Sequence, residues 1–119
     1  MSIEQRKYPR YPCNLNISVR TESHQSWQMI ALDISVKGLR IISKDFDVLI
    51  EPQSFVEISL EKHLHLPALT LSGEVKHYSY EENGQVVFGV EITKIDDEAK
   101  EKWHQLIELI RKQSLSKAM

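Results

Sequence analysis

The stretch LTLSGEVKHYSYEENGQVVFGVEI, residues 69–92, carries the clearest strand pattern in the chain. Apolar side chains alternate with other residues in two series: Leu69, Leu71 and Val75, then Val86, Phe88, Val90 and Ile92. Such alternation is typical of β-strands with one buried face. Between the two series lies Asn83-Gly84, a dipeptide that favours a type I′ turn because both central residues need a positive φ. The stretch therefore predicts an antiparallel hairpin.

Strand patterns also precede this hairpin. They cover residues 14–20, 27–35, 39–42 and 54–61. In the second of these segments we expect Ile30, Leu32 and Ile34 to share the buried face, because strand side chains point alternately to opposite sides. About six short sequential strands favour a closed antiparallel barrel, which leaves no exposed sheet edge.

After Ile95 the hydrophobic period becomes helical. Asp96 is the expected N-cap, and Asp97 and Glu98 suit the positive end of a helix dipole. The apolar residues then form one stripe: Ala99, Trp103, Leu106, Ile107 and Ile110. We expect this helix to cover an open end of the barrel.

The length of 119 residues suits one hydrophobic core, so we expect a single domain over residues 1–119. Its predicted parts are a flexible N-terminal arm (1–13), a β-barrel (14–95) and a C-terminal helix (96–114). The single cysteine, Cys13, rules out an internal disulfide and is expected to be a packed side chain. No stretch reaches the length of a membrane span and no secretory signal is evident, so we expect a cytoplasmic protein.

A basic cluster lies in QRKYPRYPCN, residues 5–14, where Arg6, Lys7 and Arg10 occur together. The prolines in this segment discourage a helix, so an extended arm is expected. Two guanidinium groups on such an arm can bind phosphate oxygens or the edge of guanine in a bidentate manner. The ordinary alternative is a solvated basic tail.

A second candidate site lies in LDISVKGLRI, residues 32–41. Alternation predicts that Asp33 and Ser35 point outward from the strand, opposite Leu32 and Ile34. Gly38 is expected to let the backbone turn and to leave room for a ligand. The ordinary alternative is a solvated strand end followed by a tight turn.

The two motifs together, R-x-x-x-R in an N-terminal arm and DISVKG at a strand end, resemble those of the PilZ domain, a bacterial receptor for cyclic di-GMP. VVFGVEI also resembles a recurring strand of that family. The resemblance implies an all-β fold, a six-stranded antiparallel barrel with a C-terminal α-helix. It further implies an effector that passes its signal to a protein partner, in processes such as motility, surface polysaccharide or pilus control.

By this resemblance, Arg6 and Arg10 would hold a guanine edge and the phosphates, and the arm would fold over the ligand. Lys7 belongs to the same cluster. Many members carry two adjacent arginines where this chain has Gln5-Arg6-Lys7, so the resemblance leaves open whether one ligand or a stacked pair binds. For the second motif, Asp33 would accept hydrogen bonds from guanine N–H groups, Ser35 would add another hydrogen bond, and Gly38 would provide clearance.

Two other functions are weighed against nucleotide binding. One is an adaptor of the same fold that works through protein contacts without a nucleotide. The other is a small barrel that binds RNA or single strands through a basic groove with exposed aromatics. The candidate aromatics are Tyr8, Tyr11, Tyr78 and Tyr80. The formal net charge of −2 disfavours this last function, because nucleic-acid polymers require a clearly basic face.

Catalytic and metal sites are not expected. The sequence has no Gly-rich phosphate loop, no nucleophile elbow and no carboxylates placed as an acid–base pair. His63 and His65 have the spacing of two ligands on one strand face, but a third metal ligand is not apparent. No cofactor is predicted beyond the ligand itself.

Overall fold

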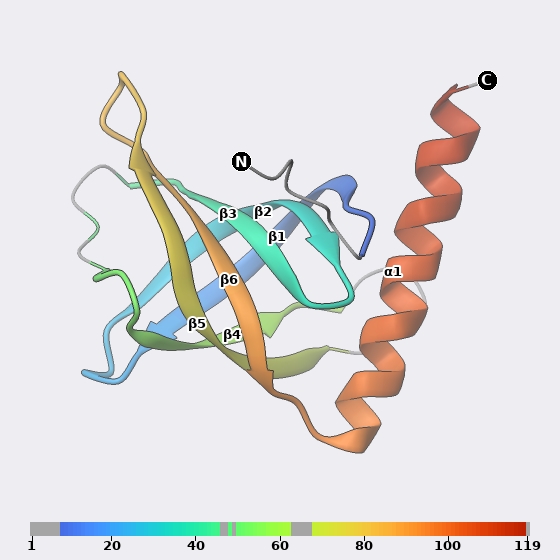
Figure 1. The fold of residues 1–119 in the computed structure, drawn as a ribbon, viewed down its shortest axis with the longest axis horizontal. Helices are drawn as coiled ribbons and strands as arrows, with labels where there is room; N and C mark the ends of the chain where they lie inside the picture. Colours follow the sequence, from blue (N-terminus) through green and yellow to red (C-terminus); the bar gives the residue numbers. More distant parts are fainter. Residues whose placement is uncertain (1–7, 46–47, 49, 63–67, 119) are drawn as a thin grey trace, which may run out of the picture.

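The computed structural model describes residues 8–45, 48, 50–62 and 68–118, without the side chains of 114–118. It contains six strands and one helix (Figure 1). The elements are β1 (Tyr11–Thr21), β2 (Ser26–Ser35), β3 (Gly38–Ser43), β4 (Phe55–Leu60), β5 (Leu69–Tyr80), β6 (Val86–Lys94) and α1 (Asp97–Ala118). Among the described residues, no helix combines the length and the apolar character needed to cross a membrane.

The strands form a closed antiparallel barrel in the order β1-β2-β3-β6-β5-β4, with β4 pairing back to β1. This confirms the predicted six-stranded barrel with a C-terminal helix. The order departs from a sequential barrel at two points, because β3 pairs with β6 rather than with β4, and β4 rather than β6 pairs with β1. As a result, the β2–β3 hairpin and the β5–β6 hairpin lie side by side in the barrel wall (Figure 1).

The core fills the barrel and extends under α1. Inward-pointing side chains from all six strands are almost completely buried, among them Ile17, Met29, Ile41, Ile58, Leu71 and Phe88. On α1 the predicted stripe is buried as well, with Trp103 only 1% exposed. Burying a large apolar side chain contributes about 1.5–3 kcal/mol, so this helix is held mainly by its packing on the barrel.

The helix begins as predicted, since the Asp96 carboxylate accepts a hydrogen bond from the Ala99 amide at 2.8 Å. It continues to Ala118, beyond the predicted end at residue 114, because neither glycine nor proline interrupts residues 97–118. At the other end of the chain, β1 begins at Tyr11. Residues 11–13, which were predicted to end the arm, therefore belong to the barrel.

The predicted face of β2 is wrong in part. Met29 and Ala31 are fully buried, whereas Ile30 and Leu32 are only half-buried. The pairing with β3 shifts register between Ala31 and Asp33. Such a bulge adds one residue to the strand and reverses the alternation beyond it, which returns Ile34 to the interior.

The β5–β6 turn also differs from the prediction. The Glu81 amide donates to the Gln85 carbonyl at 2.8 Å, and the Gly84 amide donates to the Glu81 carbonyl at 2.9 Å. Of the pair Asn83-Gly84, only Gly84 has a positive φ, 92°. These features define a longer loop, in which a type I turn is followed by a left-handed glycine, instead of a type I′ turn.

Candidate ligand-binding site

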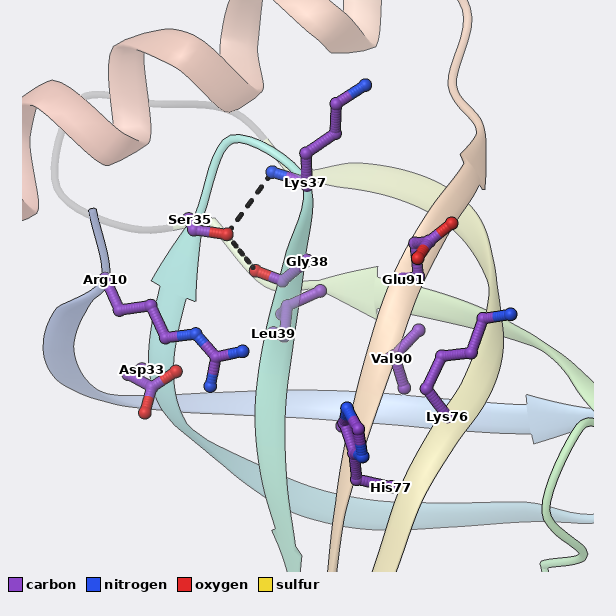
Figure 2. A pocket seen from close by; sticks show the side chains of 11 residues that line it. Arg10, Asp33, Ser35, Lys37, Gly38, Leu39, Lys76, His77, Val90 and Glu91 are labelled. Carbon is purple, nitrogen blue, oxygen red and sulfur yellow. Dashed lines mark hydrogen bonds between the residues drawn. The ribbon is translucent and has the colours of Figure 1, made fainter. Parts of the chain in front are cut away.

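A pocket lies on the outside of the barrel, where the β2–β3 hairpin runs beside β6 and β5 (Figure 2). Its volume is about 120 Å³. Arg10, Asp33, Ser35 and Gly38 all line it. The structure therefore brings together residues from both sequence motifs. Arg6 and Lys7, the other predicted residues of the arm, lie outside the described residues.

Asp33 is oriented by a neighbour that sequence reasoning missed. Arg40 Nε donates to Asp33 Oδ2 at 2.8 Å. Among the described residues, no protein donor contacts the other oxygen, Oδ1. In Figure 2 the Arg10 guanidinium also points toward this carboxylate. Asp33 is thus a positioned anion with one oxygen available to a ligand.

The Asp33–Arg40 pair had a signal in the sequence. Ser35 pairs with Gly38 across a tight turn, and this register continues to place Asp33 opposite Arg40. A two-residue hairpin turn at Val36 and Lys37 would have predicted the pair. Arg40 lies outside the DISVKG motif, so the motif alone does not predict this pair.

Ser35 differs from the expected outward-pointing hydroxyl. The residue lies in the pocket wall but is only 8% exposed. Its Oγ accepts a hydrogen bond from the Lys37 amide at 3.3 Å and donates to the Gly38 carbonyl at 3.5 Å (Figure 2). A serine in this position stabilises a tight turn. In the structure the hydroxyl therefore shapes the β2–β3 turn, and a second lone pair remains for a ligand.

Gly38 is explained by packing and not by the turn. Its φ lies outside the left-handed region that favours glycine. A Cβ at this position would lie 2.2 Å from the Val90 carbonyl oxygen. Glycine is therefore required because β6 approaches β3 closely, and not because the backbone turns here. The expected ligand clearance stays a prediction, since Gly38 also lines the pocket.

The far wall of the pocket consists of residues that the motifs did not include. Lys37 comes from the turn, and the others come from β5 and β6: Lys76, His77, Gly89 and Glu91. Local sequence patterns do not identify these residues as a site, because only barrel closure places β5 and β6 beside β2–β3. Arg10 and Lys37 make the pocket attractive to anions, whereas the Lys76 ammonium pairs with Glu74 at 3.3 Å. Asp33 and Glu91 provide acceptors.

Cys13 lies near this site and is not reactive. Its thiol is half-buried and donates to the Ala31 carbonyl at 3.4 Å. Burial, with a smaller contribution from the charge of Asp33, raises the pKa of the Cys13 thiol to about 12. Because the thiolate is the nucleophilic form, Cys13 acts as a packed side chain at neutral pH.

The remaining candidates do not converge on a second site. Tyr78 and Tyr80 contact each other edge to face, with ring centroids 5.3 Å apart. His63 and His65 lie outside the described residues. Within the part of the chain that the structure describes, no group of three or more metal-ligating side chains occurs.

Comparison with known proteins identifies the family of the chain. A family model, the PilZ domain, matches residues 4–109. The chain belongs to the PilZ domain family. The comparison with curated proteins found no match.

Solved structures share the fold at low sequence identity. The PilZ domain of YcgR from Escherichia coli with c-di-GMP has a TM-score of 0.79 and 8% identity, covering 97% of this chain and 98% of that one. Bacillus subtilis MotI/DgrA, an inhibitor of motility, has a TM-score of 0.78 and 14% identity, covering 98% and 55%. The MrkH–c-di-GMP complex of K. pneumonia has a TM-score of 0.74 and 13% identity, covering 96% and 56%. This chain thus spans about half the length of MotI/DgrA and MrkH.

Proposed function

We propose that this protein is a cyclic di-GMP receptor that binds its ligand in the pocket between Arg10 and Asp33 and passes the signal to a protein partner in the cytoplasm. The observation that carries the proposal is that Arg10 and Asp33, one from each motif, line the same pocket. The family match and the two similar structures whose names include c-di-GMP support it.

The chemistry of the pocket suits a guanine dinucleotide. Cyclic di-GMP carries two phosphodiester anions and two guanines. Arg10 can bind a phosphate or the O6/N7 edge of guanine through its planar guanidinium. Asp33 Oδ1 can accept from the N1–H and N2–H groups of guanine, while Arg40 holds Oδ2. Adenine has no N1–H donor, so this carboxylate also favours guanine.

The pocket is smaller than the ligand. Its volume of about 120 Å³ lies below the roughly 300–1,000 Å³ usual for small-molecule sites. We expect Arg6 and Lys7 to complete the enclosure, with the segment before Tyr8 closing over the ligand and contacting its phosphates. Such closure would create a new surface for a partner.

A receptor role also fits the groups present better than catalysis does. Asp33 is engaged by Arg40, and the nearby Cys13 thiol is protonated at neutral pH because burial raises its pKa to about 12. The described pocket therefore holds a ligand between fixed charges without offering an activated nucleophile.

Titration calorimetry tests the proposal directly. Wild-type protein is expected to bind cyclic di-GMP in a saturable manner and to bind cyclic di-AMP more weakly. Arg10→Ala should weaken cyclic di-GMP binding by about 5- to 150-fold, the effect of losing a bidentate contact worth about 1–3 kcal/mol. Arg20→Ala is the matched control, since Arg20 is an exposed arginine on the opposite face that pairs with Glu57.

Equal affinity in Arg10→Ala and wild type would contradict the proposed site. If folded wild-type protein gives no heat with cyclic di-GMP, the remaining function is that of an adaptor working through protein contacts alone.

A further inference from the structure

A row of cross-strand neighbours extends the pocket beyond the two motifs. Asp33 on β2 pairs with Arg40 on β3, Arg40 pairs with Gly89 on β6, and Gly89 pairs with His77 on β5. All four belong to the outer surface of the barrel around the pocket. A glycine thus lies between a guanidinium and an imidazole.

His77 borders the surface above Gly89. A Cβ placed there would have His77 atoms as its three nearest neighbours, the closest being Cδ2 at an ordinary contact distance of 3.4 Å. On the other side, the Arg40 side chain is drawn toward Asp33 by their ion pair. Gly89 therefore leaves bare strand backbone in the pocket wall, with the imidazole of His77 beside it.

Protein packing does not account for glycine at this position. A Cβ at Gly38 would lie 2.2 Å from the Val90 carbonyl oxygen, and one at Gly73 would lie 2.4 Å from Val90 Cγ1. Those two glycines are required by their neighbours. Gly89, by contrast, has room for a methyl group, and its φ lies outside the left-handed region. Gly89 and His77 both line the pocket, so the part of this surface that His77 does not contact is accessible to a ligand.

The length of the row matches a ligand with two bases. Adjacent strands lie about 4.8 Å apart, so the three steps from Asp33 to His77 span about 14 Å. A single guanine is too short to contact both ends. This spacing of the strands leaves room for Asp33 and His77 to contact different parts of a dinucleotide that occupies the pocket.

We propose that Gly89 and His77 form the subsite for the second guanine, which lies over the Gly89 backbone and stacks on the imidazole, while Asp33 binds the edge of the first guanine. This inference rests on the proposed cyclic di-GMP function and names residues of that site outside both motifs. Flat side chains that stack on bases contribute substantially to affinity and need no particular base edge.

Calorimetry with cyclic di-GMP on the full chain tests the subsite. Gly89→Ala covers this bare backbone and should weaken binding by about 5- to 150-fold without lowering the thermal midpoint of unfolding. His77→Ala should weaken binding over the same range, the effect of losing one stacked base. His77→Phe keeps a flat ring and should stay within about threefold of wild type. His104→Ala, an exposed histidine on α1, is the matched control.

A second readout is the NMR signal of the His77 Cδ2–H group, which should move upfield when a guanine stacks on the ring. Wild-type affinity in both Gly89→Ala and His77→Ala would overturn the subsite and leave the proposed function intact. A loss in His77→Phe as large as in His77→Ala would overturn stacking. Failure of wild type to bind cyclic di-GMP would overturn the proposed function and the subsite together.

Discussion

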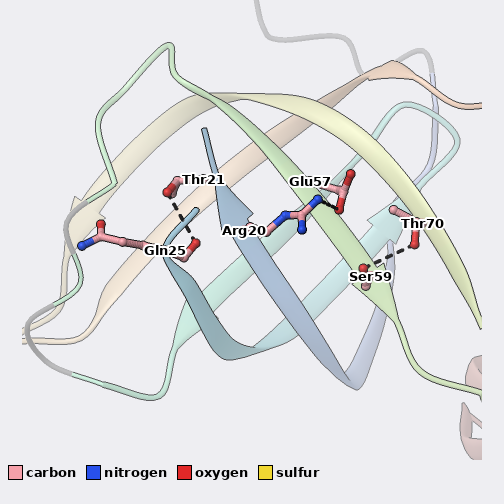
Figure 3. A network of polar contacts seen from close by, with 6 residues as sticks. All are labelled: Arg20, Thr21, Gln25, Glu57, Ser59 and Thr70. Carbon is pink, nitrogen blue, oxygen red and sulfur yellow. Dashed lines mark hydrogen bonds and ion pairs between the residues drawn. The ribbon is translucent and has the colours of Figure 1, made fainter. Parts of the chain in front are cut away.

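Two outer faces of the same barrel differ in how far their polar side chains are paired with one another. We call the outer surface of β1, β4 and the first half of β5 the network face (Figure 3), and the surface around the pocket the pocket face (Figure 2). On the network face, Arg20 pairs with Glu57 at 2.7 Å, and the hydroxyls of Ser59 and Thr70 lie 3.3 Å apart. Cross-strand partners thus satisfy the polar groups of this face.

The pocket face has glycines where such partners would lie. Because Gly38 and Gly89 have no side chains, the backbone is bare at two positions of this face. Among the described residues, neither Arg10 nor Lys37 forms an ion pair with a carboxylate, and Asp33 keeps one oxygen free. Both faces carry polar side chains, so polarity alone does not identify a binding surface. What distinguishes the pocket face is that, among the described residues, Arg10 and Lys37 form no ion pair and the Asp33–Arg40 pair leaves one carboxylate oxygen free, next to bare backbone.

The largest effect expected from this contrast concerns Asp33 on the pocket face and Glu57 on the network face, each of which pairs with an arginine. Asp33→Ala should weaken cyclic di-GMP binding by about 10- to 150-fold, because hydrogen bonds to charged groups contribute about 1.5–3 kcal/mol. Glu57→Ala, on the network face, should leave affinity unchanged. Calorimetry measures both, and a similar loss in the two variants would show that the pocket face is not special.

Substitution by alanine should affect stability differently at Gly38 and at Gly89. Gly38→Ala forces a methyl group against the Val90 carbonyl and should lower the free energy of unfolding by about 1–3 kcal/mol. Gly89→Ala should not lower it, since its Cβ meets only ordinary contacts. Urea denaturation gives both values. If the two variants are equally stable, glycine at position 38 is not explained by the approach of β6.

A smaller effect is expected for Lys37, which lines the pocket without touching Asp33. Lys37→Ala should weaken cyclic di-GMP binding by about two- to fivefold, as expected for a solvent-exposed charge worth up to about 1 kcal/mol. Its affinity should also depend less on salt than that of wild type, because one screened attraction is lost. Lys44→Ala is the control, since Lys44 contacts Asn16 away from the pocket. An unchanged salt dependence would argue against attraction by Lys37.

The smallest effect belongs to the network face itself. A double-mutant cycle of Arg20 and Glu57, both well exposed at 52% and 40% of their side chains, should give a coupling free energy of about 0.2–1 kcal/mol. Thermal or urea unfolding of the four variants measures it. A coupling well above this range would mean that the network face contributes to stability more than exposed ion pairs usually do.

Local patterns in the sequence were sufficient for much of the fold. The alternation in residues 69–92 predicted two strands that the structure confirms, and the spacing of Trp103 and Leu106 predicted the buried stripe of α1. The structure also confirms the predicted helix N-cap at Asp96. The β2 bulge was missed because one added residue between Ala31 and Asp33 leaves no signature in residue type.

The candidate site was likewise predicted only in part from the sequence. Its motif residues Arg10 and Asp33 could be named from the sequence, because charge, spacing and the outward position of a strand residue are properties of short segments. Lys76, His77 and Gly89 joined the site only when β3 paired with β6. That pairing connects segments far apart in the chain, and its cause is the burial of every strand's apolar face in one closed barrel, a condition that no single segment contains.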